Sequence, residues 1–308
     1  MRAKPPWWGG DLQTLRNRLI GKEVSVPGPA TPFEAATSDG TGDRLTGTLH
    51  GDGRRVVVLV HGLTGSEDST YIRVAAKHLV GQGFTVLRLN LRGAGSSAAL
   101  CRFSYSGASW PDVVDAVRAL EAEAVLLVGF SLGGNVLANL AARLPDDLAV
   151  AGVATVSAPI EPIQAADRMM QRRNAIYSNA LLKEMREAYR RLELTPAEAR
   201  AVEEAHSIRA FDDAITAPRF GFAGAAEYYE ATAAARVIDQ ASVPLLLIHA
   251  EDDPWIPADP YRPLAEAPPP GVTVELTPTG GHVGFHIKGF DLPWHDVRIA
   301  RFAAETLG

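Results

Sequence analysis

From residue 55 onward, short uninterrupted apolar runs alternate with longer segments in which apolar residues recur every three or four positions. An uninterrupted apolar run is typical of a strand that is buried on both faces, and in a parallel sheet the intervening helices cover those faces. The pattern therefore predicts an α/β fold with a mostly parallel central sheet flanked by helices. The expected strands are residues 55–60, 84–89, 124–129, 150–156, 244–249 and 272–276.

The first 54 residues follow a different pattern. Apolar and polar residues alternate over 45–50, and turn residues such as Ser38-Asp39-Gly40 precede this stretch, which predicts antiparallel strands at the edge of the sheet. Ahead of them, Asp11 can cap a helix, and we expect this N-terminal segment, residues 1–30, to dock on the core. The apolar face of that helix consists of Leu12, Leu15, Leu19 and Ile20.

Two further helices are predicted between the first core strands. Tyr71 and Leu79 belong to a helical repeat that ends near Gly81. The sequence Ser109-Trp110-Pro111-Asp112 has the form of a capping box, so we expect it to start a helix over residues 113–120.

The interval from residue 158 to residue 240 interrupts the alternation of strands and helices. It contains charged helical patterns and a capping sequence, Thr195-Pro196-Ala197-Glu198, but no apolar strand run. We expect it to lie over the carboxyl edge of the sheet, where ligands bind in open α/β folds. The predicted organisation is a core of residues 1–157 and 241–308 with a helical cap insertion, residues 158–240. Taken singly, each apolar or aromatic cap residue is better explained by packing inside the cap, because a helical insertion needs its own core, but together they could form a substrate roof. These residues are Met169, Met170, Ile176, Tyr177, Phe220, Phe222, Tyr228 and Tyr229.

The strongest chemical signal is Gly129-Phe130-Ser131-Leu132-Gly133. It follows an apolar strand run and precedes an alanine- and leucine-rich helical stretch. In a strand–turn–helix of this kind, the serine adopts a strained backbone conformation that lifts its hydroxyl off the sheet, and the glycines avoid collisions with the neighbouring elements. The pattern predicts a nucleophile elbow with Ser131 as the nucleophile.

A nucleophilic serine needs a base within hydrogen-bond reach, because its hydroxyl is almost un-ionised at neutral pH. Among the eight histidines, His282 is favoured because it follows the last predicted strand and glycines at 280, 281 and 284 let its loop approach the elbow. His286 is the alternative base.

The base needs an acid that fixes its tautomer. An acidic turn, Glu251-Asp252-Asp253, follows the predicted strand at 244–249. Asp253 is favoured because the acid should point inward, whereas its neighbour caps the turn or faces solvent. Asp252 is the second choice and Glu251 the third. The resulting chain order of Ser, Asp and His is the one used by nucleophile-elbow hydrolases.

The oxyanion formed by acyl transfer needs two preorganised N–H donors. In this layout they are the backbone N–H after the nucleophile, which is that of Leu132, and one from the loop after an earlier strand. His61-Gly62-Leu63-Thr64-Gly65 follows the strand at 55–60, which indicates the N–H of Leu63. His61 itself precedes the turn and is interpreted as structural.

Composition excludes several other classes of protein. The net charge of −6 is spread along the chain, which argues against nucleic-acid binding, and the single Cys101 leaves no internal disulfide and no zinc motif. Apolar runs are far shorter than the roughly 18 residues of a membrane span, and no signal segment is evident, so a cytoplasmic location is expected. Gly93 to Ala98 fits the dinucleotide fingerprint G-x-G-x-x-A, but no acidic residue ends a following strand, so no nucleotide cofactor is expected. No metal is expected either, because no set of residues has the spacing of metal ligands.

Together these motifs resemble the α/β-hydrolase superfamily, and in particular its YheT-like branch. The resemblance covers nearly the whole chain and implies a Ser-Asp-His esterase acting on carboxylic esters, with the triad carried by Ser131, Asp253 and His282. The segments that carry it are Pro6-Trp7-Trp8, Leu12-Gln13-Thr14, His61-Gly62-Leu63-Thr64-Gly65-Ser66, Asn90-Leu91-Arg92-Gly93, Gly129-Phe130-Ser131-Leu132-Gly133-Gly134-Asn135, Phe211-Asp212-Asp213, Asp252-Asp253-Pro254 and Gly281-His282-Val283-Gly284-Phe285.

The first functional hypothesis is a serine carboxylesterase that works through an acyl-enzyme intermediate on esters with short- to medium-chain or lipid-like acyl groups. The second is a weakly catalytic or non-catalytic member of the same fold that binds a small molecule. A thioesterase or amidase using the same triad is a third, because the acyl chemistry is shared.

Overall fold

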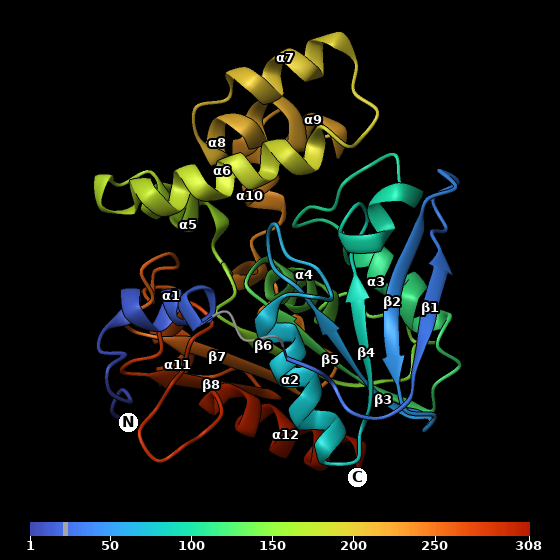
Figure 1. Ribbon diagram of the computed structural model, residues 1–308, viewed down its shortest axis with the longest axis vertical. Helices are drawn as coiled ribbons and strands as arrows, with labels where there is room; N and C mark the ends of the chain where they lie inside the picture. Colours follow the sequence, from blue (N-terminus) through green and yellow to red (C-terminus); the bar gives the residue numbers. More distant parts are fainter. Residues whose placement is uncertain (21–23) are drawn as a thin grey trace.

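The computed structural model describes residues 1–20 and 24–308, with the side chains of residues 17, 18 and 20 excepted. An eight-stranded sheet with the order β1-β2-β4-β3-β5-β6-β7-β8 runs through the molecule (Figure 1). Its strands are β1 (Ala30–Ala36), β2 (Arg44–His50), β3 (Arg55–Val60), β4 (Thr85–Asn90), β5 (Ala124–Phe130), β6 (Val150–Val156), β7 (Leu245–Ala250) and β8 (Val272–Thr277).

The strand pairing confirms the predicted mostly parallel sheet. β3 to β8 pair in parallel, whereas β2 pairs antiparallel with both β1 and β4. All six predicted core strands are present, with ends that differ from the prediction by at most one residue. Residues 45–50 belong to an antiparallel strand, as predicted. Their expected place at the edge of the sheet is wrong, because β2 lies between β1 and β4 and β1 forms that edge.

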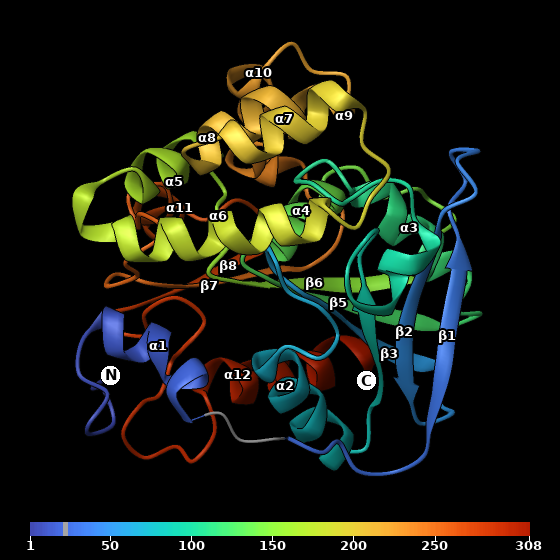
Figure 2. The ribbon, with the colours of Figure 1, turned by 45° about the horizontal axis from the view of Figure 1, so that its top comes forward.

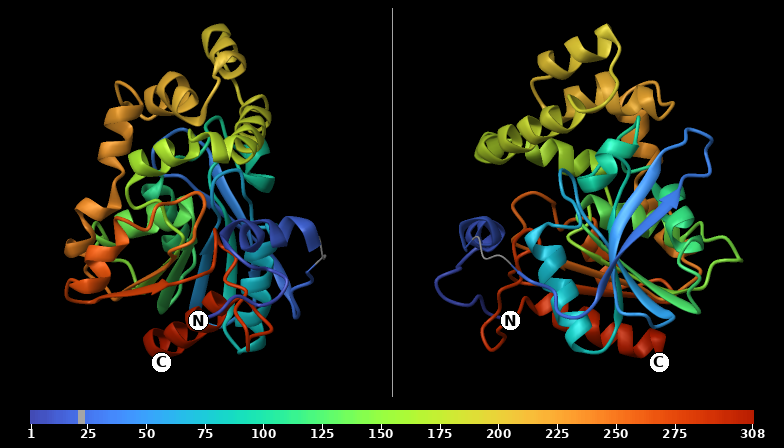
Figure 3. Two further views of the ribbon diagram at one scale, coloured as in Figure 1. Left: turned by 90° about the vertical axis from the view of Figure 1, so that its left-hand side faces the viewer. Right: turned by 45° about the vertical axis from the view of Figure 1, so that its right-hand side comes forward.

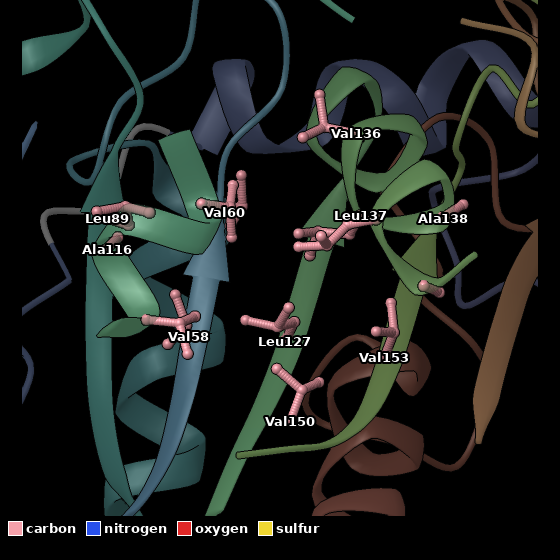
Figure 4. Packing of buried hydrophobic residues seen from close by; sticks show 14 of the residues in the cluster. Val58, Val60, Leu89, Ala116, Leu127, Val136, Leu137, Ala138, Val150 and Val153 are labelled. Carbon is pink, nitrogen blue, oxygen red and sulfur yellow. The ribbon is translucent and has the colours of Figure 1, made fainter. Parts of the chain in front are cut away.

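Helices cover both faces of the sheet, as Figures 1 and 3 show. Alternate residues of β3 point to opposite faces: Val58 and Val60 pack with α3 (Trp110–Arg118) and α4 (Leu132–Ala141), whereas Val57 and Leu59 pack with α2 (Thr70–Gly81) and α12 (Trp294–Leu307). α11 (Tyr261–Glu266) completes the first layer. Figure 4 shows the first cluster, in which strand side chains meet those of α3 and α4.

Two of the three predicted helix caps are wrong, because the side chains expected to cap bind other partners. Asp112 forms an ion pair with Arg92, and the Ser109 hydroxyl accepts the N–H of Ser106, so no capping box starts α3. α1 (Gly10–Ile20) begins one residue before Asp11, whose carboxylate contacts Arg173 and Tyr177 instead. The capping box at Thr195 and Glu198 is confirmed.

The docking of α1 differs from the prediction. Leu12 and Leu19 are 40% and 64% exposed and Leu15 is only partly buried, so most of the expected apolar face does not pack on the core; the side chain of Ile20 lies outside the described residues. Gln13, a polar residue, is instead fully buried. The helix therefore docks through hydrogen bonds rather than through leucines.

Helices dominate the segment between β6 and β7, and Figures 1 and 2 show them grouped at one end of the molecule. Two apolar clusters hold these helices together, one of them built around Phe211 and the other around Tyr228. No strand occurs among the residues described between 158 and 240, although the division into a core and a separate cap stays a prediction. The helices are α5 (Pro162–Met169), α6 (Ala175–Tyr189), α7 (Pro196–Glu204), α8 (Ile208–Phe211), α9 (Ala217–Arg219) and α10 (Ala225–Ala231), with a π-helical turn at Asp212–Thr216.

Within residues 1–20 and 24–308, no helix has the length and apolar content needed to cross a membrane.

Candidate active site

Ser131 lies in a sharp turn between β5 and α4. Its backbone has φ of 52° and ψ of −122°, a region that non-glycine residues rarely occupy and that costs about 1–3 kcal/mol. The strain is sustained by the strand on one side and the helix on the other. Ser131 thereby occupies the N-cap position of α4, where the positive end of the helix dipole favours negative charge.

The glycines of the elbow are there because neighbouring backbone leaves no room for a side chain. A Cβ on Gly129 would meet the backbone of Gly133 and Gly134, and one on Gly133 would meet the carbonyl oxygens at the end of β3. A Cβ on Gly62 would lie 2.9 Å from the Cβ of Ser131. Gly62 therefore lets the loop after β3 lie directly against the serine.

The structure brings Ser131, His282 and Asp253 together. The Oγ of Ser131 lies 3.0 Å from Nε2 of His282, and Nδ1 of His282 lies 2.9 Å from Oδ2 of Asp253. Asp253 and His282 are buried, whereas Ser131 is partly exposed towards a cavity. With Nδ1–H donating to the carboxylate, Nε2 is left as an acceptor for the serine hydroxyl.

The carboxylate of Asp253 is fixed in one orientation. Its Oδ1 accepts the N–H groups of Trp255 at 2.8 Å and Ile256 at 3.0 Å, which leaves Oδ2 for the imidazole. Burial alone would raise the pKa of Asp253, but the charge and hydrogen bond of His282 outweigh it and hold the pKa below its usual value. Asp253 is therefore ionised at neutral pH.

The alternative acids have other partners. Asp252 accepts the hydroxyl of Thr279 and the N–H groups of Gly280 and Gly281, so it shapes the loop that carries His282. Glu251 is exposed and forms an ion pair with Arg262.

The imidazoles of His286, the alternative base, and of His61 have hydrogen-bond partners other than Ser131. Nε2 of His286 lies 3.2 Å from Arg16, and burial followed by the charge of Arg16 lowers the pKa of His286 to about 3. His61 is fully buried, its Nε2 accepts the N–H of Leu91, and burial lowers its pKa to about 4. His61 has the structural surroundings expected of it from the sequence.

Trp255 is a site residue that the sequence analysis did not single out. Its ring stacks on the imidazole of His282 with centroids 4.4 Å apart and 28° between the planes, and it lines the cavity. It could have been predicted from the sequence, because it follows Asp253 by two residues on the turn that supplies the catalytic acid. An aromatic ring there restricts the motion of the imidazole.

The two expected oxyanion donors lie beside Ser131. Leu63 and Leu132 both line the cavity, and Leu132 is the first residue of α4. The hydroxyl of Tyr71 accepts the N–H of Gly62 at 2.9 Å and thereby holds the loop that carries Leu63. This arrangement can direct two N–H groups at an oxygen bound next to Ser131.

The cavity over Ser131 has a volume of about 470 Å³, within the range of small-molecule sites. Three of the eight predicted roof residues line it: Met169, Tyr228 and Tyr229. Met170 and Ile176 are exposed instead. Residues of α6 also line the cavity and were not predicted from the sequence: Leu181, Glu184, Met185, Ala188 and Tyr189.

Asp212 is a buried acid in the wall of this cavity. Its Oδ2 accepts the hydroxyl of Tyr229 at 2.7 Å, and among the described residues no basic side chain forms an ion pair with it. Burial raises the pKa of Asp212 to about 6, and hydrogen bonds from Tyr229 and Thr216 offset this only in part.

We predict that Asp212 makes the protein less stable as pH rises from about 4 to 6. In that window the folded protein keeps a proton that the unfolded chain has released, so about 3 kcal/mol of stability is lost over the window and stays lost above it. Asp212→Asn, which keeps an acceptor for Tyr229, should therefore be more stable than the parent at pH 7.5 and equal to it near pH 4. Urea unfolding at both pH values measures this, and an equal difference at both would contradict it.

Neither a metal nor a nucleotide site is evident in the part of the chain that the structure describes. No group of three or more His, Cys, Asp or Glu side chains is arranged around a common point in residues 1–20 and 24–308. The glycine pattern at 93–98 leads into a six-residue 3-10 helix, Gly95–Leu100, whereas a dinucleotide fingerprint needs the N-terminus of a longer α-helix.

The family model and the most similar curated proteins agree on the family of this chain. The family described as alpha/beta hydrolase fold matches residues 55–288. The Escherichia coli (strain K12) protein named "Putative esterase YheT" is 34% identical over 293 residues, which cover 89% of this chain and 83% of that protein. A Saccharomyces cerevisiae protein named "Monoacylglycerol lipase" is 27% identical over 267 residues, covering 82% of this chain and 59% of that protein.

Solved structures agree on the fold. The Pyrococcus furiosus esterase Pf2001 superposes with a TM-score of 0.62 at 17% identity, covering 93% of this chain and 99% of that one. The mouse alpha/beta hydrolase domain-containing protein 10 superposes with a TM-score of 0.58 at 15% identity, covering 89% and 99%. At these identities the similarity concerns the fold alone.

Proposed function

The chain belongs to the α/β-hydrolase superfamily, and on this premise we propose that it is a serine carboxylesterase that cleaves carboxylic esters through an acyl-enzyme intermediate. The observation that carries the proposal is the continuous hydrogen-bonded series from Ser131 through His282 to the buried Asp253. The esterase and lipase names of the relatives support the same class of reaction.

In the acylation step, the Oγ of Ser131 attacks the ester carbonyl carbon while Nε2 of His282 takes the hydroxyl proton. Asp253 stays ionised and stabilises the imidazolium that forms. The negative oxygen of the tetrahedral intermediate accepts the N–H groups of Leu63 and Leu132. When the intermediate collapses, His282 returns the proton to the leaving alcohol, and the acyl group remains on Ser131.

In the deacylation step, water takes the place of the alcohol. His282 removes a proton from the water as it attacks the acyl carbon, and then returns that proton to the serine oxygen as the carboxylic acid leaves. The positive end of α4, which begins at Leu132, favours the negative oxygen in both steps.

The surroundings of Ser131 support an acyl group of short to medium length or a lipid-like one. Apolar side chains from the cap and the core share the cavity wall with hydroxyl and carboxyl groups. The apolar lining residues that belong to the cap helices include Met169 of α5 and Leu181 and Met185 of α6. Such a wall gains free energy for each methylene it removes from water.

A chain-length series of p-nitrophenyl esters tests the proposed function. We expect kcat/KM to rise by up to about fourfold for each added methylene, the equivalent of ~0.8 kcal/mol, until the cavity is filled, and then to fall. Matched thioesters and amides in the same assay decide between an esterase and the related hydrolases. Binding of the longer esters without turnover of any of them would contradict the proposal and favour a non-catalytic binding protein.

A further inference from the structure

The loop that carries His282, residues 280–286, is here called the histidine loop. It forms neither a helix nor a strand, and its backbone is strained, with φ of 58° at Val283 and 49° at Phe285. A β-branched residue in this region is an outlier that persists only where surrounding contacts impose it. The position of the imidazole therefore depends on what holds the loop from outside.

The N-terminal helix α1 supplies much of that support. The hydroxyl of Thr14 accepts the N–H of His282 at 2.8 Å and donates to the carbonyl oxygen of Gly10 at 2.7 Å. At the other end of the loop, the side-chain amide of Gln13 accepts the N–H of His286 at 2.7 Å and donates to the carbonyl oxygen of His286 at 3.0 Å. Two consecutive residues of α1 thus hold the loop at the catalytic residue and at its far end.

The backbones of α1 and the histidine loop are in direct contact. A side chain on Gly281 would collide with the Gly10 carbonyl oxygen and with Gln13, and one on Gly284 would lie 2.6 Å from the Gln13 carbonyl oxygen. A side chain on Gly10 would collide with the backbone of Asp252, beside the catalytic acid. Figures 1 and 2 show α1 against the orange to red loops that follow β7 and β8.

Of the side chains described in α1, the one buried most completely is polar, which indicates that hydrogen bonds rather than apolar contacts hold the helix on the histidine loop. Gln13 is fully buried with hydrogen bonds at both ends of its amide, while Leu12 beside it is 40% exposed. Burying an amide costs free energy that its hydrogen bonds must offset, whereas burying a leucine would have been favourable by itself. Thr14 also lines the cavity, so α1 reaches the substrate site itself.

We propose that Thr14 and Gln13 are positioning residues for the reaction, which hold His282 at hydrogen-bond distance from both Ser131 and Asp253. The inference rests on the proposed function for its kinetic readout. Without the hydroxyl of Thr14, the N–H of His282 loses its acceptor and the loop relaxes towards less strained backbone angles. A shift of about 1 Å in a catalytic group lowers the rate about 100-fold.

Thr14→Val tests this, because valine has the shape of threonine and lacks the hydroxyl. We expect kcat on a short ester to fall about 10- to 100-fold with little change in KM, and Thr14→Ser to recover most of the lost rate. Thr14→Ala is the second variant, since alanine favours the helix and protects folding while removing the same acceptor. Leu12→Ala, on the exposed side of the same helix, should keep the parent kcat.

Hydrogen–deuterium exchange of the histidine loop gives a readout that does not depend on activity. We expect the loop amides of Thr14→Val to exchange faster than those of the parent and of Leu12→Ala. If the parent hydrolyses no ester, the proposed function fails, yet faster exchange would still support the role of Thr14. A Thr14→Val protein with the parent kcat and the parent exchange rates would overturn the inference.

Discussion

Replacing Ser131 with alanine is expected to lower kcat on p-nitrophenyl esters by about 10⁴- to 10⁶-fold, to the level of residual catalysis by the oxyanion donors alone. The change removes the atom that forms the acyl-enzyme and leaves the rest of the cavity in place. Initial rates with and without the substitution, at saturating substrate, measure the effect.

The fold should tolerate this change well. Ser131 has a positive φ that alanine adopts at a cost similar to that of serine, and among the described side chains its Oγ hydrogen-bonds to the imidazole of His282. We therefore expect the free energy of unfolding to change by less than about 1 kcal/mol. A folded alanine variant that keeps the parent rate would show that the nucleophile is a different residue.

Asp253→Asn is expected to have the second largest effect, a fall in kcat of about 10⁴-fold. The amide nitrogen would face Nδ1 of His282 and favour the tautomer in which Nε2 carries the proton. In that tautomer Nε2 cannot accept the hydroxyl proton of Ser131. Rates measured from pH 6 to 9 check whether the loss persists across the range, as a wrong tautomer requires.

Asp252→Asn is the matched control on the adjacent residue. Its oxygen still accepts the N–H groups of Gly280 and Gly281, and its nitrogen can donate to the hydroxyl of Thr279, so the histidine loop keeps its shape. We expect a loss of about tenfold at most. Equal losses in the two variants would contradict the assignment of Asp253 as the partner of His282.

Much of the fold follows from local sequence patterns. The core strands were predictable because an apolar run such as 55–60 has few alternatives to a strand buried on both faces. The nucleophile elbow was equally predictable from the sequence. The glycines around Ser131 are required by close backbone contacts of the strand, turn and helix, so they mark the elbow in the sequence. The choice of His282 over His286 came from glycines that do allow the loop to approach α1 and Ser131 closely.

The features that the sequence did not predict depend on distant contacts. Asp112 lies in a plausible capping sequence, yet the buried Arg92 takes its carboxylate. The exposure of Leu12 and the burial of Gln13 reverse the usual pattern of a surface helix, because the histidine loop offers α1 hydrogen bonds. The cavity wall formed by α6 could not be located because helical periodicity does not distinguish a face that lines a cavity from one that packs on a neighbour.

Covalent labelling tests the central claim, that Ser131 is the nucleophile, most directly. The parent protein is treated with a fluorophosphonate, digested, and the modified peptide is identified by mass spectrometry. We predict one adduct, on the oxygen of Ser131, with labelling lost in Ser131→Ala and strongly slowed in Asp253→Asn. An adduct on another residue, or hydrolysis of esters by a parent protein that the reagent neither labels nor inhibits, would contradict the account.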